Sequence, residues 1–258
     1  MIFLARFFKV IRLIWFSLFG NSISKYECRH ELLSIFAFVN GFRLYSRNLA
    51  WINDKEYLSI WGKFPFRKGN NIHERKFNLY NIAKSLVNVP GDVVECGVFH
   101  GGSSFLMLKA SIETNKHLYG FDSFEGLSEP KSIDLDSAKY TFKWKKHDMC
   151  IDMRTVEHNL ASFKGRYTLF KGWIPKRFNE VKDKKFSLVH IDVDLYEPTM
   201  ESLQFFYSRV TPGGVIVCDD YGFLSCPGAK KAMDDFVSDK QECSVIHLTT
   251  GQGLIIKQ

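Results

Sequence analysis

Acidic residues follow two short apolar runs in the second half of the chain, at the points where those runs end. Asp192 lies in LVHIDVDLYEP, and Asp219 and Asp220 end GGVIVCDD. Such runs are typical of buried parallel strands, whose carboxyl ends form the ligand-binding edge of an α/β sheet. Carboxylates gathered there repel one another unless a cation joins them, and an all-oxygen set suits Mg²⁺. The pattern predicts a magnesium site of Asp192, Asp219 and Asp220; solvated loop acids or helix N-caps are the alternative interpretation.

A glycine-rich turn lies upstream, in GDVVECGVFHGGSS. Gly97, Gly101 and Gly102 let the backbone approach a ligand closely, and Glu95 stands at the end of the expected strand. The G-x-G-x-x-G fingerprint of dinucleotide sites is absent, and a carboxylate at this point favours a cationic ligand such as S-adenosylmethionine over a diphosphate. Asp122 ends the next strand, where an acid commonly binds ribose hydroxyls. These features predict an adenosine-type cofactor; tight packing at the turn and a turn cap at Asp122 are the alternatives.

Strand and helix patterns alternate from His73 to the C-terminus, and these elements must position the acids. The expected strands are 91–98, 117–124, 167–172, 186–194 and 213–220, followed by 244–249 and 253–258 around a Gly-Gln-Gly turn. Helical patterns separate the first five. The chain is therefore predicted to form a doubly wound, mostly parallel, seven-stranded α/β sheet with an antiparallel last strand. We expect residues 73–258 to be the cofactor domain and residues 1–72 an amphipathic helix with a helical cap or lid.

The first 20 residues, MIFLARFFKVIRLIWFSLFG, are strongly apolar but carry three cations. Arg6, Lys9 and Arg12 leave no uncharged run long enough to span a bilayer, and the pattern of a signal peptide is missing. On a helical wheel the cations share one side, which is typical of a basic helix lying in a membrane interface. The alternative is a helix packed against the domain or against a second copy in a homo-oligomer.

Composition narrows the partners and the compartment. The net charge of +7 comes from scattered lysines and arginines, which favour a solvated surface over a nucleic-acid groove. We therefore expect no nucleic-acid partner. The six cysteines form no CxxC pair, and no Asn-x-Ser/Thr sequon occurs, which favours the reducing cytoplasm, with peripheral contact to the inner face of the cell membrane through residues 1–20.

Seven motifs, in this order, resemble those of the macrocin-type sugar O-methyltransferases: GDVVECGVFHGGSS, YGFDSFEGL, FKGWIP, HIDVDLYEPT, GGVIVCDDYG, CPGAKKAMDDF and TGQGLIIK. These class I enzymes use S-adenosylmethionine and Mg²⁺ to methylate sugar hydroxyls of macrolide and aminocoumarin antibiotics. The resemblance covers roughly residues 73–258. Residues 1–72 do not clearly match, although in the family this region helps to form the lid and the substrate site.

The resemblance implies a role for each motif residue. Cofactor-binding positions fall on Glu95, Gly97 and Asp122, with Ser123 beside the ribose; the glycine turn itself adds Gly101 as a cofactor-binding candidate. The metal ligands fall on Asp192, Asp219 and Asp220, and the proposed general base falls on Asp194. Glu197 ranks below Asp194 as the base, and His190 is expected to be a buried core histidine.

The implied reaction is methyl transfer to a sugar or glycan hydroxyl. Mg²⁺ stabilises the alkoxide, and Asp194 accepts the proton. If the strand extends through Asp194, its side chain projects from the same face as that of Asp192. Two other functions stay open: a catechol-type O-methyltransferase, and a membrane-associated module that keeps the cofactor fold without catalysis.

Overall fold

The computed structural model describes all of the 258-residue chain except residues 1, 37–45, 66–71, 136–143, 239 and 241. The chain divides into two compact units, Met1–Ser59 and Ile60–Gln258, so the division lies before the expected one at 72–73. Aromatic packing explains the difference. Trp61 stacks on Phe64 at 5.2 Å between ring centroids, and Phe64 packs at 5.3 Å against Phe105 of the larger unit. These residues therefore belong to the core of the second unit.

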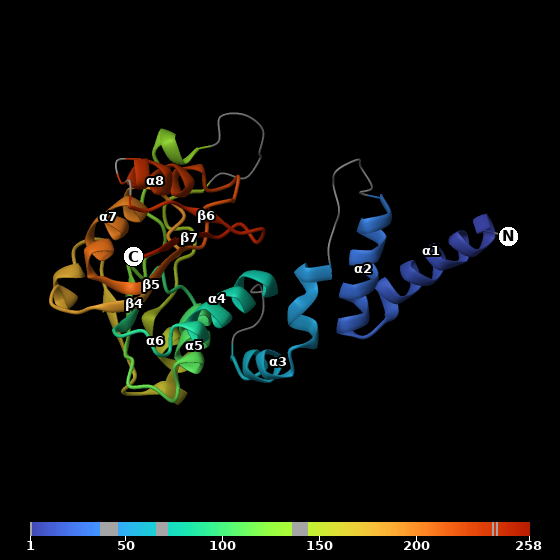
Figure 1. Cartoon of the computed structure of the whole chain (residues 1–258), viewed down its shortest axis with the longest axis horizontal. Helices are drawn as coiled ribbons and strands as arrows, with labels where there is room; N and C mark the ends of the chain where they lie inside the picture. Colours follow the sequence, from blue (N-terminus) through green and yellow to red (C-terminus); the bar gives the residue numbers. More distant parts are fainter. Residues whose placement is uncertain (1, 37–45, 66–71, 136–143, 239, 241) are drawn as a thin grey trace. The chain divides into compact units, whose positions relative to one another are not determined.

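The second unit contains a single seven-stranded sheet (Figure 1). Its strands are β1 (Asp92–Cys96), β2 (Leu118–Asp122), β3 (Tyr167–Lys171), β4 (Phe186–Ile191), β5 (Val210–Cys218), β6 (Ile246–His247) and β7 (Gly253–Ile256). They are ordered β3-β2-β1-β4-β5-β7-β6. The first five pair in parallel, and β7 pairs antiparallel with both β5 and β6. The predicted sheet and its terminal hairpin are confirmed.

Helices cover both faces of this sheet. They are α4 (His73–Ser85), α5 (Gly102–Ala110), α6 (Met153–Asn159), α7 (Tyr196–Phe206) and α8 (Pro227–Ser238), with 3₁₀ turns at Ser132–Asp134, Ala161–Phe163, Phe178–Val181 and Tyr207–Arg209. In Figure 1, α7 and α8 lie together on one side of the sheet and α4 and α5 on the other. The central strands are covered on both faces, as every residue of β4 is buried. This burial fixes the strand ends that carry the acids.

Strand β4 ends at Ile191 and does not continue to Asp194. Asp194 has a φ of +59°, in the left-handed region, so the chain turns sharply after the strand. The condition for placing Asp192 and Asp194 on one strand face is therefore not met. Any cooperation between the two carboxylates depends on the shape of the turn.

The first unit contains α1 (Ile2–Phe19), α2 (Ser22–Phe36) and a 3₁₀ segment (Ser46–Asn53), and α3 (Lys55–Trp61) crosses its boundary. Helix α1 packs on α2 through a face that buries Leu13 and Ser17. Lys9 pairs with Glu31 at 2.5 Å, and Arg29 donates to the Ser17 carbonyl at 3.2 Å. Within the described residues, neither α1 nor any other helix has the length and apolarity needed to cross a membrane.

Candidate active site

The register aligns the carboxyl ends of four parallel strands. Cys96 at the end of β1 lies opposite Phe121 of β2 and Ile191 of β4. The end of β4 lies in turn opposite Cys218 of β5. The residues that follow these pairs therefore form one row along the sheet edge: Asp122, Gly97, Asp192 and Asp219. The acids that the sequence placed at separate strand ends are thus brought together by strand pairing.

Gly97 is the point where the glycine turn and the acidic edge touch. Its φ is +84°, and a Cβ atom built on it would lie 1.9 Å from the carbonyl oxygen of Asp192. A side chain at this position would collide with the backbone of the neighbouring strand end. Glycine is therefore required for the turn to lie directly beside Asp192.

A cavity of about 850 Å³ opens over this row. Gly97, Asp122 and Ser123 line one part of it, together with residues 98–100 of the glycine turn. The other part is lined by the carboxylates of Asp192, Asp194, Asp219 and Asp220. One cavity therefore contains both the predicted cofactor residues of β1 and β2 and the predicted metal ligands.

Two predicted cofactor residues, Glu95 and Gly101, lie behind the turn and do not line the cavity. Glu95 is only 1% exposed; it accepts a hydrogen bond from the Ser104 hydroxyl and lies 3.1 Å from Nδ1 of His190. Burial raises the pKa of Glu95, against the opposing effect of His190. Gly101 has a φ of +81° at the start of α5. In this structure both residues support the shape of the turn.

Asp122 lines the cavity and also fixes the glycine turn. Its Oδ2 accepts from the backbone N–H groups of Val98 (2.8 Å) and Phe99 (2.9 Å), and its Oδ1 accepts from Phe124 N–H at 2.7 Å. Ser123 beside it closes the next turn through its hydroxyl. The turn-cap interpretation of Asp122 is therefore confirmed. A carboxylate has lone pairs left for ribose hydroxyls, so the two roles are compatible.

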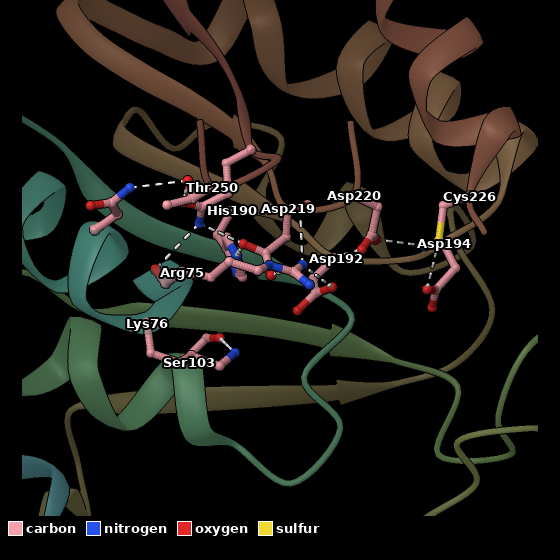
Figure 2. Close-up of polar contacts among 12 residues, drawn as sticks. Arg75, Lys76, Ser103, His190, Asp192, Asp194, Asp219, Asp220, Cys226 and Thr250 are labelled. Carbon is pink, nitrogen blue, oxygen red and sulfur yellow. Dashed lines mark hydrogen bonds and ion pairs between the residues drawn. The ribbon is translucent and has the colours of Figure 1, made fainter. Parts of the chain in front are cut away.

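The three predicted metal ligands surround one nitrogen of Arg75, a residue of α4 (Figure 2). Nη2 of Arg75 donates to Oδ2 of Asp219, lies 3.2 Å from Oδ1 of Asp220 and lies 3.9 Å from Oδ1 of Asp192. Gln252 donates to the second oxygen of Asp219 at 2.6 Å. Both Arg75 and Asp219 are buried. The carboxylates thus converge on the guanidinium group of Arg75.

His190 connects this cluster with the base of the glycine turn. It is fully buried, as predicted, with Nδ1 facing Glu95 and Nε2 3.5 Å from Oδ1 of Asp219. Burial lowers the pKa of His190, but hydrogen bonding and attraction to Asp219 and Glu95 outweigh it and raise the pKa to about 10. A protonated His190 therefore holds both carboxylates in place.

The pKa values show how charge is distributed in the cluster. Burial alone would raise the pKa of Asp219, but Arg75 and His190 outweigh it and hold that pKa well below its usual range. The pKa of Asp220 is raised far above normal by burial and by Asp194 and Asp192. Nearby positive charge thus favours the ionised form of Asp219, but it does not offset burial and carboxylate repulsion at Asp220. A further cation would stabilise the ionised cluster.

Asp194 faces a different set of partners from Asp219. Its Oδ1 lies 3.5 Å from Sγ of Cys226, and its backbone N–H donates to Oδ2 of Asp220 at 3.2 Å. Burial and the nearby Asp192 raise the pKa of Asp194 to about 7. A carboxyl that lines the cavity and titrates near neutral pH is suited to accept a proton from a bound hydroxyl.

The donor set fits a divalent cation. Across the part of the chain that the structure describes, two groups each bring three potential ligand atoms within 4.8 Å of one another: His190 with Asp192 and Asp219, and Asp194 with Asp220 and Cys226. A protonated His190 has no free lone pair, so the carboxylates are the ligands of the first group. The predicted ligands are thus divided between two adjacent groups. Arg75 bridges them and occupies their centre with a cationic nitrogen. The positively charged guanidinium lies where a metal cation would bind, and the carboxylate oxygens suit Mg²⁺.

Sequence reasoning missed three residues of this site. Arg75 lies in HERKFNLY, where it resembles a surface cation of an amphipathic helix, and it reaches Asp219 across 144 positions of sequence. Gln252 lies in the terminal Gly-Gln-Gly turn, and Cys226 immediately precedes α8. The one signal available in the sequence was the set of three acids expected to lie together, because buried acids need a positively charged partner.

A sequence profile describing the macrocin O-methyltransferases (TylF) matches residues 73–248. The chain belongs to this family. The matched segment contains the glycine turn, Asp122 and all four acids of the cavity. The seven-stranded sheet is accordingly that of the class I methyltransferases.

Individual relatives support the same assignment. The chain is 30% identical over 151 residues to the 8-demethyl-8-(2,3-dimethoxy-alpha-L-rhamnosyl)-tetracenomycin-C 4′-O-methyltransferase of Streptomyces olivaceus, a match covering 55% of this chain and 57% of that protein. The match thus spans little more than half the length of this relative. Among solved structures, the O-methyltransferase NovP (24% identity, 71% and 79% coverage) has a TM-score of 0.57. The calicheamicin methyltransferase CalS11 (17% identity, 79% and 93% coverage) has a TM-score of 0.59. These likenesses show the fold.

Proposed function

We propose that this protein is an S-adenosylmethionine-dependent and Mg²⁺-dependent O-methyltransferase that methylates a sugar hydroxyl of a small glycosylated molecule or glycan. The observation that carries the proposal is the sharing of one cavity by the glycine turn, Asp122 and the carboxylate cluster. Membership of the macrocin O-methyltransferase family supports the reaction. The sugar acceptor is supported by the Streptomyces olivaceus relative, whose name describes a 4′-O-methyltransferase acting on a rhamnosyl derivative.

Each part of the cavity has a task in this reaction. S-adenosylmethionine supplies an electrophilic methyl group, and Mg²⁺ lowers the pKa of a coordinated hydroxyl. Gly97 would allow the cofactor to approach the sheet edge, and Asp122 would accept hydrogen bonds from its ribose. Asp192, Asp219 and Asp220 would hold the metal.

Proton balance assigns the remaining step to Asp194. With S-adenosylmethionine bound, transfer of its methyl group to the acceptor oxygen would leave the electron pair of the broken carbon–sulfur bond on sulfur and would release the hydroxyl proton. The hydroxyl proton moves to the carboxylate of Asp194. Gln252 donates to Asp219, and His190 lies between Asp219 and Glu95, so Asp219 is oriented before the acceptor arrives.

An acceptor screen tests the proposal. Purified protein is incubated with labelled S-adenosylmethionine and Mg²⁺ against nucleotide sugars, glycosylated small molecules, polysaccharide intermediates and catechols. We expect label to transfer to a sugar hydroxyl and S-adenosylhomocysteine to form in equal amount. Binding of S-adenosylmethionine without transfer to any acceptor class would favour a non-catalytic module.

A catechol-type reaction is the second candidate because aromatic side chains line the cavity. Trp144, Trp173 and Phe223 all contribute to its wall, and a planar diol needs an apolar slot beside the metal. Transfer to catechols with none to sugars would select this alternative. The metal and base assignments would stay the same.

Replacement of Asp122 by alanine should weaken binding of S-adenosylmethionine by about 1–3 kcal/mol, because charge-assisted hydrogen bonds to the ribose are lost. The same change releases the backbone N–H groups of the glycine turn, so a melting curve must accompany the calorimetry. Asp148→Ala is the matched control, because the Asp148 side chain also accepts a backbone N–H bond in a turn but does not itself line the cavity. Unchanged affinity in Asp122→Ala would leave only the turn-cap role.

We also propose that α1 docks on the cytoplasmic face of an anionic membrane. The residues opposite its α2-facing side are large, apolar and exposed: Phe7, Phe8, Ile11, Ile14, Trp15, Leu18 and Phe19. Arg12 lies beside this stripe, with its guanidinium 5.9 Å from the Phe16 ring. An exposed apolar stripe with a cation beside it is typical of an interfacial helix, although Lys9 is paired with Glu31 of α2. A second copy of the chain is the other occupant that would bury it.

Serine replacement of Phe8, Trp15 and Phe19 together should release the protein from anionic liposomes, because apolar burial supplies most of the affinity. Binding of the unaltered protein should weaken with salt but persist. Co-sedimentation measures both effects, and deletion of residues 1–20 should act in the same way with methyl transfer intact. Leu33→Ser, an exposed apolar position of α2, is the control. If the unaltered protein stays in the supernatant in the liposome assay and is a dimer in solution, α1 is a contact between two copies of the chain.

A further inference from the structure

Arg75 contacts the carboxylate cluster in an unusual way. An arginine usually binds carboxylates with two nitrogens of its planar fork. Here a single nitrogen, Nη2, faces Asp219, Asp220 and Asp192 and also donates to the Asp219 carbonyl at 2.9 Å. Nε of the same guanidinium is buried without a hydrogen-bond partner. One nitrogen surrounded by four oxygens has the arrangement of a point cation, and the donors of an NH₂ group cannot satisfy all four.

The charge of the guanidinium does not balance the acids around it. Asp192, Asp219 and Asp220 contact it directly, and Asp194 adds a fourth carboxyl to the same cavity. Arg75 contributes a single positive charge on the cavity side of the cluster, and the other buried cation, His190, is shared between Asp219 and Glu95. A divalent ion at the position of Nη2 would carry twice that charge and accept the carboxylate oxygens directly. The ion and the guanidinium therefore compete for the same oxygens.

We infer that Arg75 is the internal counter-ion of the metal-free protein and that it withdraws from the carboxylates when a divalent cation binds. This inference rests on the metal site of the proposed function. It gives Arg75 a positioning role: the residue keeps the acids together in the empty site and then yields them.

Withdrawal has a consequence for the cavity wall. Cζ of Arg75 lies 4.4 Å from the centre of the Phe223 ring, and both residues line the cavity. Movement of the guanidinium removes this cation–π contact. Metal binding thereby changes the wall beside Asp219 and Asp220.

Calorimetric titration with Mg²⁺, without cofactor or acceptor, tests the competition. Arg75→Met should lower the Kd for Mg²⁺ about tenfold or more, because a buried positive charge a few ångströms from the ion is removed. Lys84→Met is the matched control: it removes an exposed cation from the same helix, which lies over the Tyr80 ring and does not line the cavity. Its Kd should stay close to that of the unaltered protein. A Kd that rises or stays constant in Arg75→Met overturns the inference while leaving the metal site intact.

Thermal melting gives an independent sign. Metal-free Arg75→Met should melt below the unaltered protein, because buried carboxylates lose their counter-ion, and Mg²⁺ should raise its melting temperature by more than it raises that of the unaltered protein. An equal or smaller rise contradicts the competition. If neither protein binds Mg²⁺ in the calorimeter, both the metal site and the inference fall.

A measurement on the unaltered protein tests the inference even if Arg75→Met does not fold. The side-chain NMR signals of Arg75, assigned by their loss in Arg75→Lys, should shift and sharpen when Mg²⁺ is added. Signals that stay unchanged at saturating Mg²⁺ show that the guanidinium remains on the carboxylates, and they overturn the inference.

Discussion

Asp192→Asn should lower metal-dependent methyl transfer by about 10³-fold while leaving S-adenosylmethionine binding unchanged, since Lewis-acid stabilisation is worth several kcal/mol and each ~1.4 kcal/mol is tenfold in rate. Asp192 is the clearest ligand to alter. Its side chain keeps 28% of its exposure, and its only ion pair among the described residues is the long one to Arg75 at 3.9 Å. Loss of this carboxylate therefore removes a metal ligand with little effect on the fold. Initial rates over a Mg²⁺ titration, with calorimetry for the cofactor, measure the two effects separately.

Asp219→Asn should abolish the same activity and also destabilise the protein. Arg75 and His190 would both lose the carboxylate that holds them, and a buried charge left without its partner costs about 3–5 kcal/mol. Glu180→Gln, which breaks an exposed pair with Arg177, is the control for loss of a carboxylate. Full activity of the unaltered enzyme after EDTA treatment would contradict the metal assignment for both positions.

The positions of Asp192 and Asp219 show which features of the site could be predicted from the sequence. Strand ends were predictable because β1, β4 and the second half of β5 are short runs of mostly apolar residues, each followed by a glycine or an acid. Parallel pairing then places Gly97, Asp192 and Asp219 in one row, and this follows from the register of neighbouring strands alone. The fold and the row of acids were therefore accessible from local patterns.

The partners of those acids were not accessible in the same way. Arg75 reaches Asp219 from a helix that precedes β1, and Gln252 reaches it from the last turn of the chain. Neither contact has a periodic signature, because each depends on how a helix or hairpin packs on the finished sheet. Glu95 shows the reverse case: its place at a strand end was predicted correctly, but the side chain points into the core toward His190. Alternation along β1, and not the motif, decides that direction.

Asp194 lies between these two cases. Its spacing from Asp192 predicted a shared strand face, yet the strand ends at Ile191 and a left-handed φ of +59° turns the chain. Asp194 still lines the cavity because the turn directs it toward Cys226 and Asp220. The local geometry was wrong and the location was right. Its catalytic role therefore has to be tested by its own variant.

Asp194→Asn should lower kcat by about 10²–10⁴-fold, the usual contribution of a general base, with Mg²⁺ affinity nearly preserved. The amide keeps the size of the side chain and cannot take the proton from the acceptor. Rates at saturating acceptor and calorimetry with Mg²⁺ test the two parts. A variant that loses the metal would make Asp194 a ligand, and a variant with normal kcat would remove it from the mechanism.

The pH dependence gives a sharper test because the sign is fixed. A base works in its ionised form, and burial with the nearby Asp192 raises the pKa of Asp194 to about 7 in the cation-free site. The rate should therefore fall as pH decreases through this pKa, with a midpoint at or below about 7, since a bound cation lowers the pKa of a neighbouring acid. This acidic limb should disappear in Asp194→Asn. Glu197→Gln is the matched control, because Glu197 lines the same cavity but is exposed and paired with Lys131. A limb that persists in Asp194→Asn and disappears in Glu197→Gln would transfer the role of base to Glu197.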